Sequence, residues 1–380
     1  MSDRGLNLCC VVNETNNEAL WALFQSGWLR AYDSWNSRPA AELLLDVPPG
    51  VRMLAGGEWL WLNVGDERLI LVDPVTAQVA REVALPHELD VPAVLVEAFA
   101  FGSVWVAKPG LLGRLGEAAA SAAELPGEFQ PSAITAADRW LWAGATDGRL
   151  ARIDPATGEV AAVEHLPADH GGNHGDKCLA YGGAGLVATV CNQPDIFVMD
   201  PLTARPLWSA QVPDGSYIVS LYSAGDDVWA VGSNGTAVLL GDAQQPIKAT
   251  VEFSEDAEDF PAAFAAGSLW IASEGDWQVT RIDQATGSVL AEIDWEPEES
   301  ETFANPRLWL EGGRSSLWGG NTETDGITRI DPVANRVVHL GQAEQAVVDT
   351  VVASSPGKRD PAPKSPVSGR PKLTVIRGGG

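Results

Sequence analysis

The chain has 380 residues and a formal net charge of −26, with 25 Lys and Arg against 51 Asp and Glu. This charge argues against nucleic acid as a partner, because a polyanion would be repelled. The sequence also lacks any apolar run near the roughly 20 residues that cross a bilayer. Residues 1–6 lack the pattern of a secretory leader, so we expect a cytoplasmic protein that contacts no membrane.

A short segment with a buried-type tryptophan returns along the whole chain. Its copies are centred on Trp21, Trp61, Trp105, Trp142, Trp229, Trp270 and Trp318, and an eighth copy has Val187 in place of tryptophan. The repeat length is about 42 residues, which is the size of a four-stranded propeller blade. The 15 Trp, 39 Gly and 25 Pro agree with a β protein that has many turns.

An Asp-centred turn follows each Trp segment in step. Its copies begin at Asp73, Asp154, Asp200, Asp283 and Asp331, and weaker copies begin at Asp33, Gly116 and Gly241. The aspartate can accept backbone N–H groups, Pro presets φ at the next position, and Gly or Asn tolerates the left-handed conformation. We therefore interpret these aspartates as structural and do not expect them to be catalytic.

Runs of small residues precede several Trp segments, as in 98–101, 133–136 and 262–266. These runs suit an innermost strand, where blades crowd toward an axis. The sequence thus predicts an all-β fold, an eight-bladed β-propeller over residues 1–342, rather than two stacked sandwiches. Seven blades remain an alternative, because 346–352 could compete with 6–12 at the closure of the ring.

The repeat resembles a known group of bacterial propellers. Gly-x-Leu-Trp-x-Ala followed by Arg152-Ile153-Asp154-Pro155-Ala156-Thr157-Gly158 is similar to the YVTN and streptogramin-lyase-like repeat. Residues 196–208 also resemble the quinoprotein-type repeat, which builds eight-bladed propellers. The resemblance implies a WD40-like fold, but these repeats occur in enzymes and non-enzymes alike.

Two departures from these families concern activity. The Trp strands end in Ala143, Ala230, Ala272 or Gly319, where streptogramin lyases tend to have a strand ending in Glu, and no matching His–Glu pair is present. Cys9 and Cys10 are adjacent, as in quinoprotein dehydrogenases, yet they fall in an expected N-terminal strand. The chain is also short for that enzyme class, so we do not expect its cofactor.

Several segments between blades are strongly acidic. The candidate binding residues there are His87, Glu88, Asp90, Glu255, Asp256, Glu258 and Asp259, and 296–301 is similar. A negative rim would attract a basic protein partner or a cation, and a small molecule is a further possibility. The alternative is a solvated surface that keeps the protein soluble.

The sharpest group of chemically active residues is His170, His174, Cys178 and Cys191. A hairpin centred near residue 184 would place the two cysteines roughly opposite each other, beside the loop that contains the histidines. Two thiolates and two imidazoles suit tetrahedral Zn²⁺. Reduced core cysteines are the competing interpretation.

The C-terminal segment differs from the rest of the chain. Residues 343–380 are predicted to form a Pro-rich, flexible tail, and 354–380 contain six Lys and Arg against Asp360 alone. Opposite charge predicts that this tail lies against the acidic face at low salt. Taken together, these features favour a non-catalytic binding or assembly platform, and the alternative is a lyase- or hydrolase-type enzyme with a metal or histidine at the mouth of the channel.

Overall fold

The structure is a computed structural model. It describes the residues 8–14, 19–24, 26–33, 39–48, 51–64, 68–86, 89, 96–117, 119–166, 179–189, 193–213, 216–254, 260–273, 277–295, 308–313, 315–321 and 326–339. The expected C-terminal tail lies outside these residues.

The described residues form 32 strands, four to each of eight sheets. The strands of blades 1 to 4 are β1 (Leu8–Glu14), β2 (Ala19–Phe24), β3 (Trp28–Asp33), β4 (Pro39–Leu44), β5 (Arg52–Gly56), β6 (Trp59–Val64), β7 (Arg68–Asp73), β8 (Gln78–Ala84), β9 (Val96–Ala100), β10 (Ser103–Lys108), β11 (Leu111–Leu115), β12 (Ala120–Glu124), β13 (Pro131–Ala137), β14 (Trp140–Ala145), β15 (Arg149–Ile153) and β16 (Val160–His165). Those of blades 5 to 8 are β17 (Leu179–Gly182), β18 (Gly185–Thr189), β19 (Asp195–Met199), β20 (Pro206–Gln211), β21 (Ile218–Ala224), β22 (Asp227–Gly232), β23 (Thr236–Leu240), β24 (Ile247–Glu252), β25 (Ala262–Ala265), β26 (Ser268–Ser273), β27 (Gln278–Asp283), β28 (Val289–Asp294), β29 (Leu308–Gly312), β30 (Leu317–Asn321), β31 (Gly326–Asp331) and β32 (Arg336–His339).

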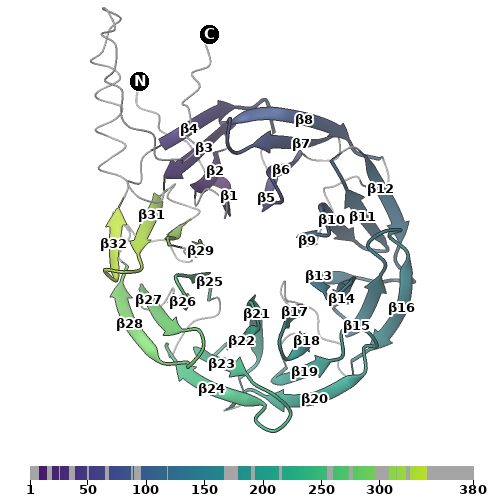
Figure 1. Ribbon diagram of the computed structural model, residues 1–380, viewed down its shortest axis with the longest axis vertical. Helices are drawn as coiled ribbons and strands as arrows, with labels where there is room; N and C mark the ends of the chain where they lie inside the picture. Colours follow the sequence, from purple (N-terminus) through teal and green to yellow (C-terminus); the bar gives the residue numbers. More distant parts are fainter. Residues whose placement is uncertain are drawn as a thin grey trace, which may run out of the picture.

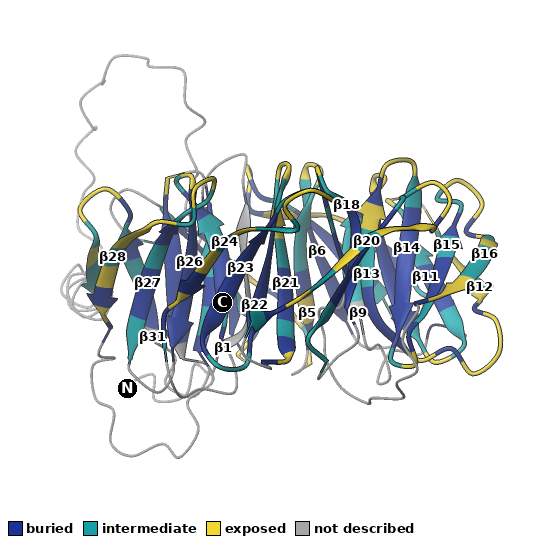
Figure 2. Ribbon diagram, turned by 90° about the horizontal axis from the view of Figure 1, so that it is seen from below, coloured by how far each residue is buried: buried dark blue, intermediate teal, exposed yellow. Residues whose placement is uncertain are grey.

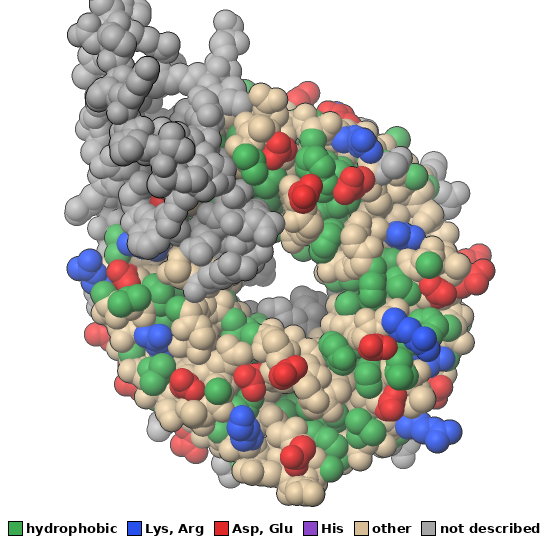
Figure 3. Space-filling view, viewed as in Figure 1, with side chains coloured by type: hydrophobic (Ala, Val, Ile, Leu, Met, Phe, Trp, Pro, Cys, Tyr) green, Lys and Arg blue, Asp and Glu red, His purple; other side chains and the backbone are tan. Residues whose placement is uncertain are grey.

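Each sheet consists of four consecutive strands in sequence order, and every neighbouring pair is antiparallel. The sheets stand as blades around a central opening, with the first strand of each blade innermost and the fourth outermost (Figures 1 and 3). The predicted eight-bladed propeller is therefore confirmed, and the seven-bladed alternative is wrong.

Within the described residues, the ring closes between blades 8 and 1 without a shared sheet, because blade 1 contains only β1–β4 and blade 8 contains only β29–β32. The inner strands β1 and β29 are neighbours across this closure. Buried aromatic side chains join the two blades there, with the rings of Tyr32 and Trp318 centred 6.4 Å apart. The segment 346–352, which we considered for this closure, lies outside the described residues.

The repeated tryptophans all lie on the second strand of their blades. Seven blades have tryptophan at this position and blade 5 has Val187, as the sequence predicted. All eight side chains are buried. They pack between neighbouring blades, and the outermost strands, such as β20 and β24, are the most exposed (Figure 2). Burial of the large indole rings therefore supplies much of the apolar area that holds the blades together.

The Asp-centred turns connect the third and fourth strands. In the clearest case Asp200 Oδ1 accepts from the backbone N–H groups of Leu202 and Thr203 at 2.8 and 2.9 Å. Asp242, in the weaker copy that begins at Gly241, accepts in the same way from Gln244 and Gln245. These backbone N–H groups lower the pKa of both aspartates. The structural role predicted for the repeated aspartates is confirmed.

The preceding blade holds several of these turns. Arg114 of blade 3 donates to the carbonyl of Ala156 in the blade 4 turn at 3.1 Å. Arg281 of blade 7 donates to the carbonyl of Pro332 in the blade 8 turn at 2.5 Å. Arg114 and Arg281 also lie over the rings of the buried tryptophans in their own blades. The Asp turn is thus a point of attachment between blades as well as a change of direction.

Candidate functional site

The topology divides the connections between two faces. Because strands alternate in direction, loops that join one blade to the next share a face with loops between second and third strands. We call this the loop face. The opposite side, which has the short first-to-second turns and the Asp turns, is the turn face.

The acidic binding residues predicted from the sequence belong to connections on the loop face. Glu255, Asp256, Glu258 and Asp259 join β24 to β25, and His87, Glu88 and Asp90 join β8 to β9. All seven residues lie outside the described residues, so they stay a prediction. Leu89, between them in sequence, is described and buried against blades 2 and 3.

The predicted metal ligands His170, His174, Cys178 and Cys191 also lie outside the described residues. The described part of their hairpin pairs Leu179 with Ala188. Direct opposition of the two cysteines would require Leu179 to pair with residue 190, two positions further on. No three His, Cys, Asp or Glu side chains come together as a metal site within the described ranges. The zinc site remains a prediction.

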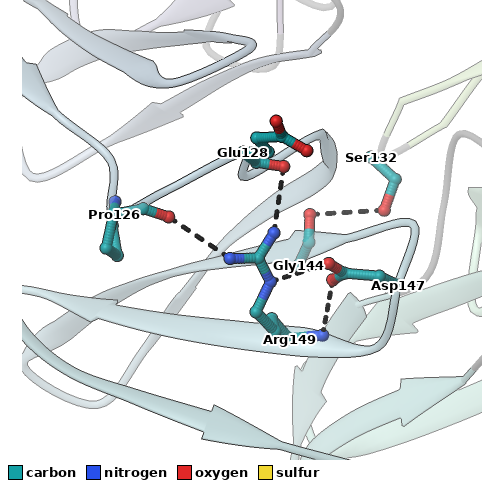
Figure 4. A network of polar contacts seen from close by, with 6 residues as sticks. All are labelled: Pro126, Glu128, Ser132, Gly144, Asp147 and Arg149. Carbon is teal, nitrogen blue, oxygen red and sulfur yellow. Dashed lines mark hydrogen bonds and ion pairs between the residues drawn. The ribbon is translucent and has the colours of Figure 1, made fainter.

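One loop-face connection is fully described and held by an arginine. Arg149, the first residue of β15, donates from Nη2 to the carbonyl of Glu128 at 2.9 Å and from Nη1 to that of Pro126 at 3.3 Å (Figure 4). Its Nε lies 2.7 Å from Asp147 Oδ2, and its guanidinium lies over the buried ring of Phe129. These contacts fix residues 125–130, which lead into the inner strand of blade 4.

The same position in blade 2 has the same function. Arg68, the first residue of β7, donates to the carbonyl of Asp46 at 2.7 Å and pairs with Glu82. Asp46 lies in the connection that leads into blade 2. An arginine at the start of the third strand therefore fastens the entering loop of its own blade, and the network in Figure 4 is structural.

A different polar group lies between blades 2 and 3, near the central opening. It consists of Arg52 on β5, Asn63 on β6 and Glu97 on β9, which we call the Glu97 cluster. Arg52 and Glu97 stand near the beginning of inner strands, and Asn63 near the end of its strand, so all three are at the loop-face end of their blades. Arg52 pairs directly with Asn63 across the sheet.

The two buried members of the Glu97 cluster are hydrogen-bonded across the blade interface. Asn63 Nδ2 donates to Glu97 Oε1 at 3.0 Å, and Arg52 Nε lies 4.0 Å from the same oxygen. The side chain of Glu97 is 7% exposed, whereas that of Arg52 is 49% exposed. Burial raises the pKa of Glu97, and the bond from Asn63 and the charge of Arg52 oppose this only in part.

The fold does not require polar residues at these positions. Residues at the place of Glu97 in the other blades are Val11, Met53, Ile134, Leu179, Leu221, Ala262 and Leu310. Those at the place of Asn63 are Leu23, Ala107, Gly144, Thr189, Val231, Ala272 and Gly320. Only blade 3 has a charge at the first position, and only blade 2 has an amide at the second.

Sequence reasoning missed this cluster, although a signal was present. Aligning the repeats on their tryptophans would have placed Asn63 two residues after Trp61, and Glu97 eight residues before Trp105. Each then stands out against a column of almost wholly apolar or small residues. The cluster offers one carboxyl, one amide and one guanidinium, which suits recognition of a polar ligand better than hydrolysis by two carboxyl groups.

Comparisons with known proteins support the fold and leave the activity open. No protein-family model matches the chain, and no curated protein matches it. The designed protein Ika8 matches with a TM-score of 0.65 at 15% identity, over 85% of this chain and 96% of Ika8. The propeller domain of Myceliophteria thermophila Cps50 (Swd1) matches with 0.51 at 15%, over 86% and 96%. BamB from Moraxella catarrhalis matches with 0.50 at 16%, over 70% and 82%.

The chain is a β-propeller. At these identities the similarity establishes the arrangement of strands and nothing about a ligand or a reaction. Among the described residues there is no helix long and apolar enough to cross a membrane.

Proposed function

We propose that this propeller is a non-catalytic binding or assembly platform whose loop face receives a basic protein partner. β-Propellers often serve in protein interaction or assembly. The observation that supports this face is the charge of the connections that meet at blade 7. Its entering segment 255–259 and its second-to-third loop 274–276 contain only acidic charges, and its leaving connection, between β28 and β29, contains four Glu against Arg307.

Acidic side chains elsewhere in the repeat have a local structural role. The aspartates of the turn face accept backbone N–H groups of their own turns. The acidic residues around blade 7 exceed anything that the repeat needs, since the corresponding connection 125–130 in blade 4 has Glu128 as its only charge. A concentration of one charge on one face attracts partners of opposite charge and accelerates their encounter.

A charge-neutralised variant tests this proposal. Glu255, Asp256, Glu258 and Asp259 are changed to Gln or Asn, and binding of a lysine-rich peptide to the full chain is measured by fluorescence anisotropy over a range of salt concentrations. The matched control neutralises four acidic residues of the turn face, namely Glu58, Asp138, Glu159 and Asp226. We expect the first variant to lose at least tenfold in affinity and to show a weaker salt dependence.

Equal loss of affinity in both variants would mean that the peptide responds to net charge and to no particular face. That result would contradict the proposal. Retention of the salt dependence in the loop-face variant would do the same.

The alternative enzyme of the lyase or hydrolase class rests on His170 and His174 at the mouth of the channel. Metal analysis of the purified protein tests its zinc form. Bound zinc, together with a lower thermal midpoint in His174→Ala, would favour this alternative. Protein without zinc, whose midpoint does not respond to that change, would remove it. The resemblance to YVTN and streptogramin-lyase-like repeats does not decide between the two functions.

A further inference from the structure

The Glu97 cluster contains a buried acceptor that the fold leaves unused. Asn63 is 4% exposed, and its Oδ1 has no hydrogen-bond partner among the described residues, whereas its Nδ2 donates to Glu97. A buried acceptor without a partner is destabilising unless something else supplies the missing donor. The side chain of Asn63 therefore points to a ligand that has an N–H or O–H group.

At two other blade interfaces, the positions that correspond to Asn63 and Glu97 are occupied by small or apolar residues. At the interface of blades 4 and 5, a Cβ placed on Gly144 would lie 3.2 Å from Leu179 Cδ1, so the two residues are in close contact. At the interface of blades 3 and 4, Ala107 and Ile134 pack in one apolar cluster. These two interfaces assemble with apolar contacts, so the propeller does not need the Asn63–Glu97 pair in order to form.

The charges of the cluster further restrict the chemical class of the ligand. The carboxylate of Glu97 and the free Oδ1 of Asn63 are both acceptors, and an ammonium group would satisfy both. A bare amine would be repelled by the guanidinium of Arg52, whose Nε lies 4.0 Å from Glu97 Oε1. A ligand that carries an anionic group next to its ammonium group removes this conflict, because the anion can pair with Arg52.

We propose that the Glu97 cluster binds the ammonium and carboxylate groups of a small free amino acid. The ammonium donates to Asn63 Oδ1 and Glu97, and the carboxylate accepts from Arg52. The side chain of Arg52 is 49% exposed and stands on an inner strand beside the central opening, so a ligand that enters from solvent can reach its guanidinium. This site is independent of the partner proposed for the loop face.

The proposed site has a consequence for the protonation of Glu97. Burial raises the pKa of this carboxyl because its charged form is poorly compensated. A bound ammonium would supply the missing compensation and lower the pKa again. Ligand binding is therefore expected to release a proton near that pKa, in addition to satisfying the amide oxygen.

Equilibrium dialysis of the full chain against each of the twenty common amino acids tests the proposal. At least one is expected to bind saturably with one site per chain. Its primary amide, which lacks the carboxylate, and its N-acetyl derivative, which lacks the ammonium, should each bind at least tenfold more weakly. The absence of binding by every amino acid would overturn the proposal, as would equal binding of the N-acetyl derivative.

A variant designed from the protein's own repeat provides the second test. Asn63→Ala with Glu97→Ile copies the Ala107 and Ile134 pair, so it is expected to fold, with an unchanged circular dichroism spectrum and an equal or higher thermal midpoint. Binding of the amino acid should fall at least tenfold. Arg52→Gln should weaken binding of the amino acid but not of its amide. Unchanged affinity in the folded double variant would place the ligand elsewhere and overturn the proposal.

Discussion

The indole Nε1 of Trp142 donates to the carbonyl oxygen of Pro201 at 3.2 Å, although the two residues belong to different blades. Trp142 lies on the second strand of blade 4, and Pro201 lies in the Asp turn of blade 5. Arg152 of blade 4 donates to Leu202 in the same turn. Trp229 of blade 6 bonds to Gln284 in the turn of blade 7 at 3.3 Å. The tryptophan of one blade and the Asp turn of the next blade, the two motifs that define the repeat, are thus joined by hydrogen bonds.

Replacement of Trp142 by Phe should loosen the turn of blade 5. The change removes the bond to Pro201 and part of a buried ring, at a cost of about 2 kcal/mol. Trp270→Phe is the matched control, because its indole bonds within its own blade, to Ala265 at 3.0 Å. Hydrogen exchange of residues 200–205 should accelerate in Trp142→Phe alone. Equal acceleration in both variants would contradict the role of the inter-blade bond.

Acidification should destabilise the propeller through its Asp turns. The folded-state pKa values of Asp200, Asp242, Asp283 and Asp331 lie below the ordinary value of 3.8. A lowered pKa contributes stability that is present above 3.8 and is lost as the pH falls through the folded value. Changing all four residues to Asn keeps an acceptor oxygen but removes the charge. The thermal midpoint of this variant should therefore fall less steeply with acid than that of the unaltered protein.

Glu97 should show the opposite dependence on pH. Its folded-state pKa is raised above 4.5, so its contribution is most favourable below 4.5 and declines as the pH rises through the folded value. Glu97→Gln resembles the protonated carboxyl and should raise the thermal midpoint at neutral pH. The gain should shrink as the pH approaches 4.5. A constant difference across this range would show that the ionisation of Glu97 has no part in it.

Arg149→Met should release the connection 125–130 while leaving the strands in place. The variant loses the bonds to Pro126 and Glu128 but keeps an aliphatic chain over Phe129, and we expect a loss of about 1 kcal/mol. Limited proteolysis should then cut within 125–130. Arg139→Met is the control, because Arg139 is exposed and lies over Trp140 on the opposite face. Similar cleavage in both variants would contradict the anchoring function of Arg149.

The fold could be predicted well from the sequence because the repeat is marked by bulky tryptophans and by turn residues that restrict the backbone. Buried tryptophan and an Asp-centred turn each permit few local structures, so seven tryptophan copies in step with five clear turns leave little choice of architecture. The side chains of the Glu97 cluster gave a weaker signal, which appears only when the repeats are aligned. Asn63 and Glu97 are 34 residues apart, belong to different repeats and match no motif, and only the packing of blade 3 on blade 2 brings them together.

The histidine and cysteine group was prominent in the sequence because its members are rare and close together. Closeness along the chain says little about which side chains converge in a propeller, because residues that meet across a blade interface are about one repeat apart in sequence. In such folds, a residue that departs from the repeat is a better guide to function. The other copies of the repeat show which residue types satisfy packing at that position.

The closure of the ring without a shared sheet has a consequence for synthesis on the ribosome. Among the described residues each blade consists of four consecutive strands, so a blade is complete once those four strands have been made. Blades can therefore form one after another as the nascent polypeptide emerges. The docking of Trp318 beside Tyr32 requires both the first and the eighth blade, so this aromatic contact converts an open arc of blades into a ring.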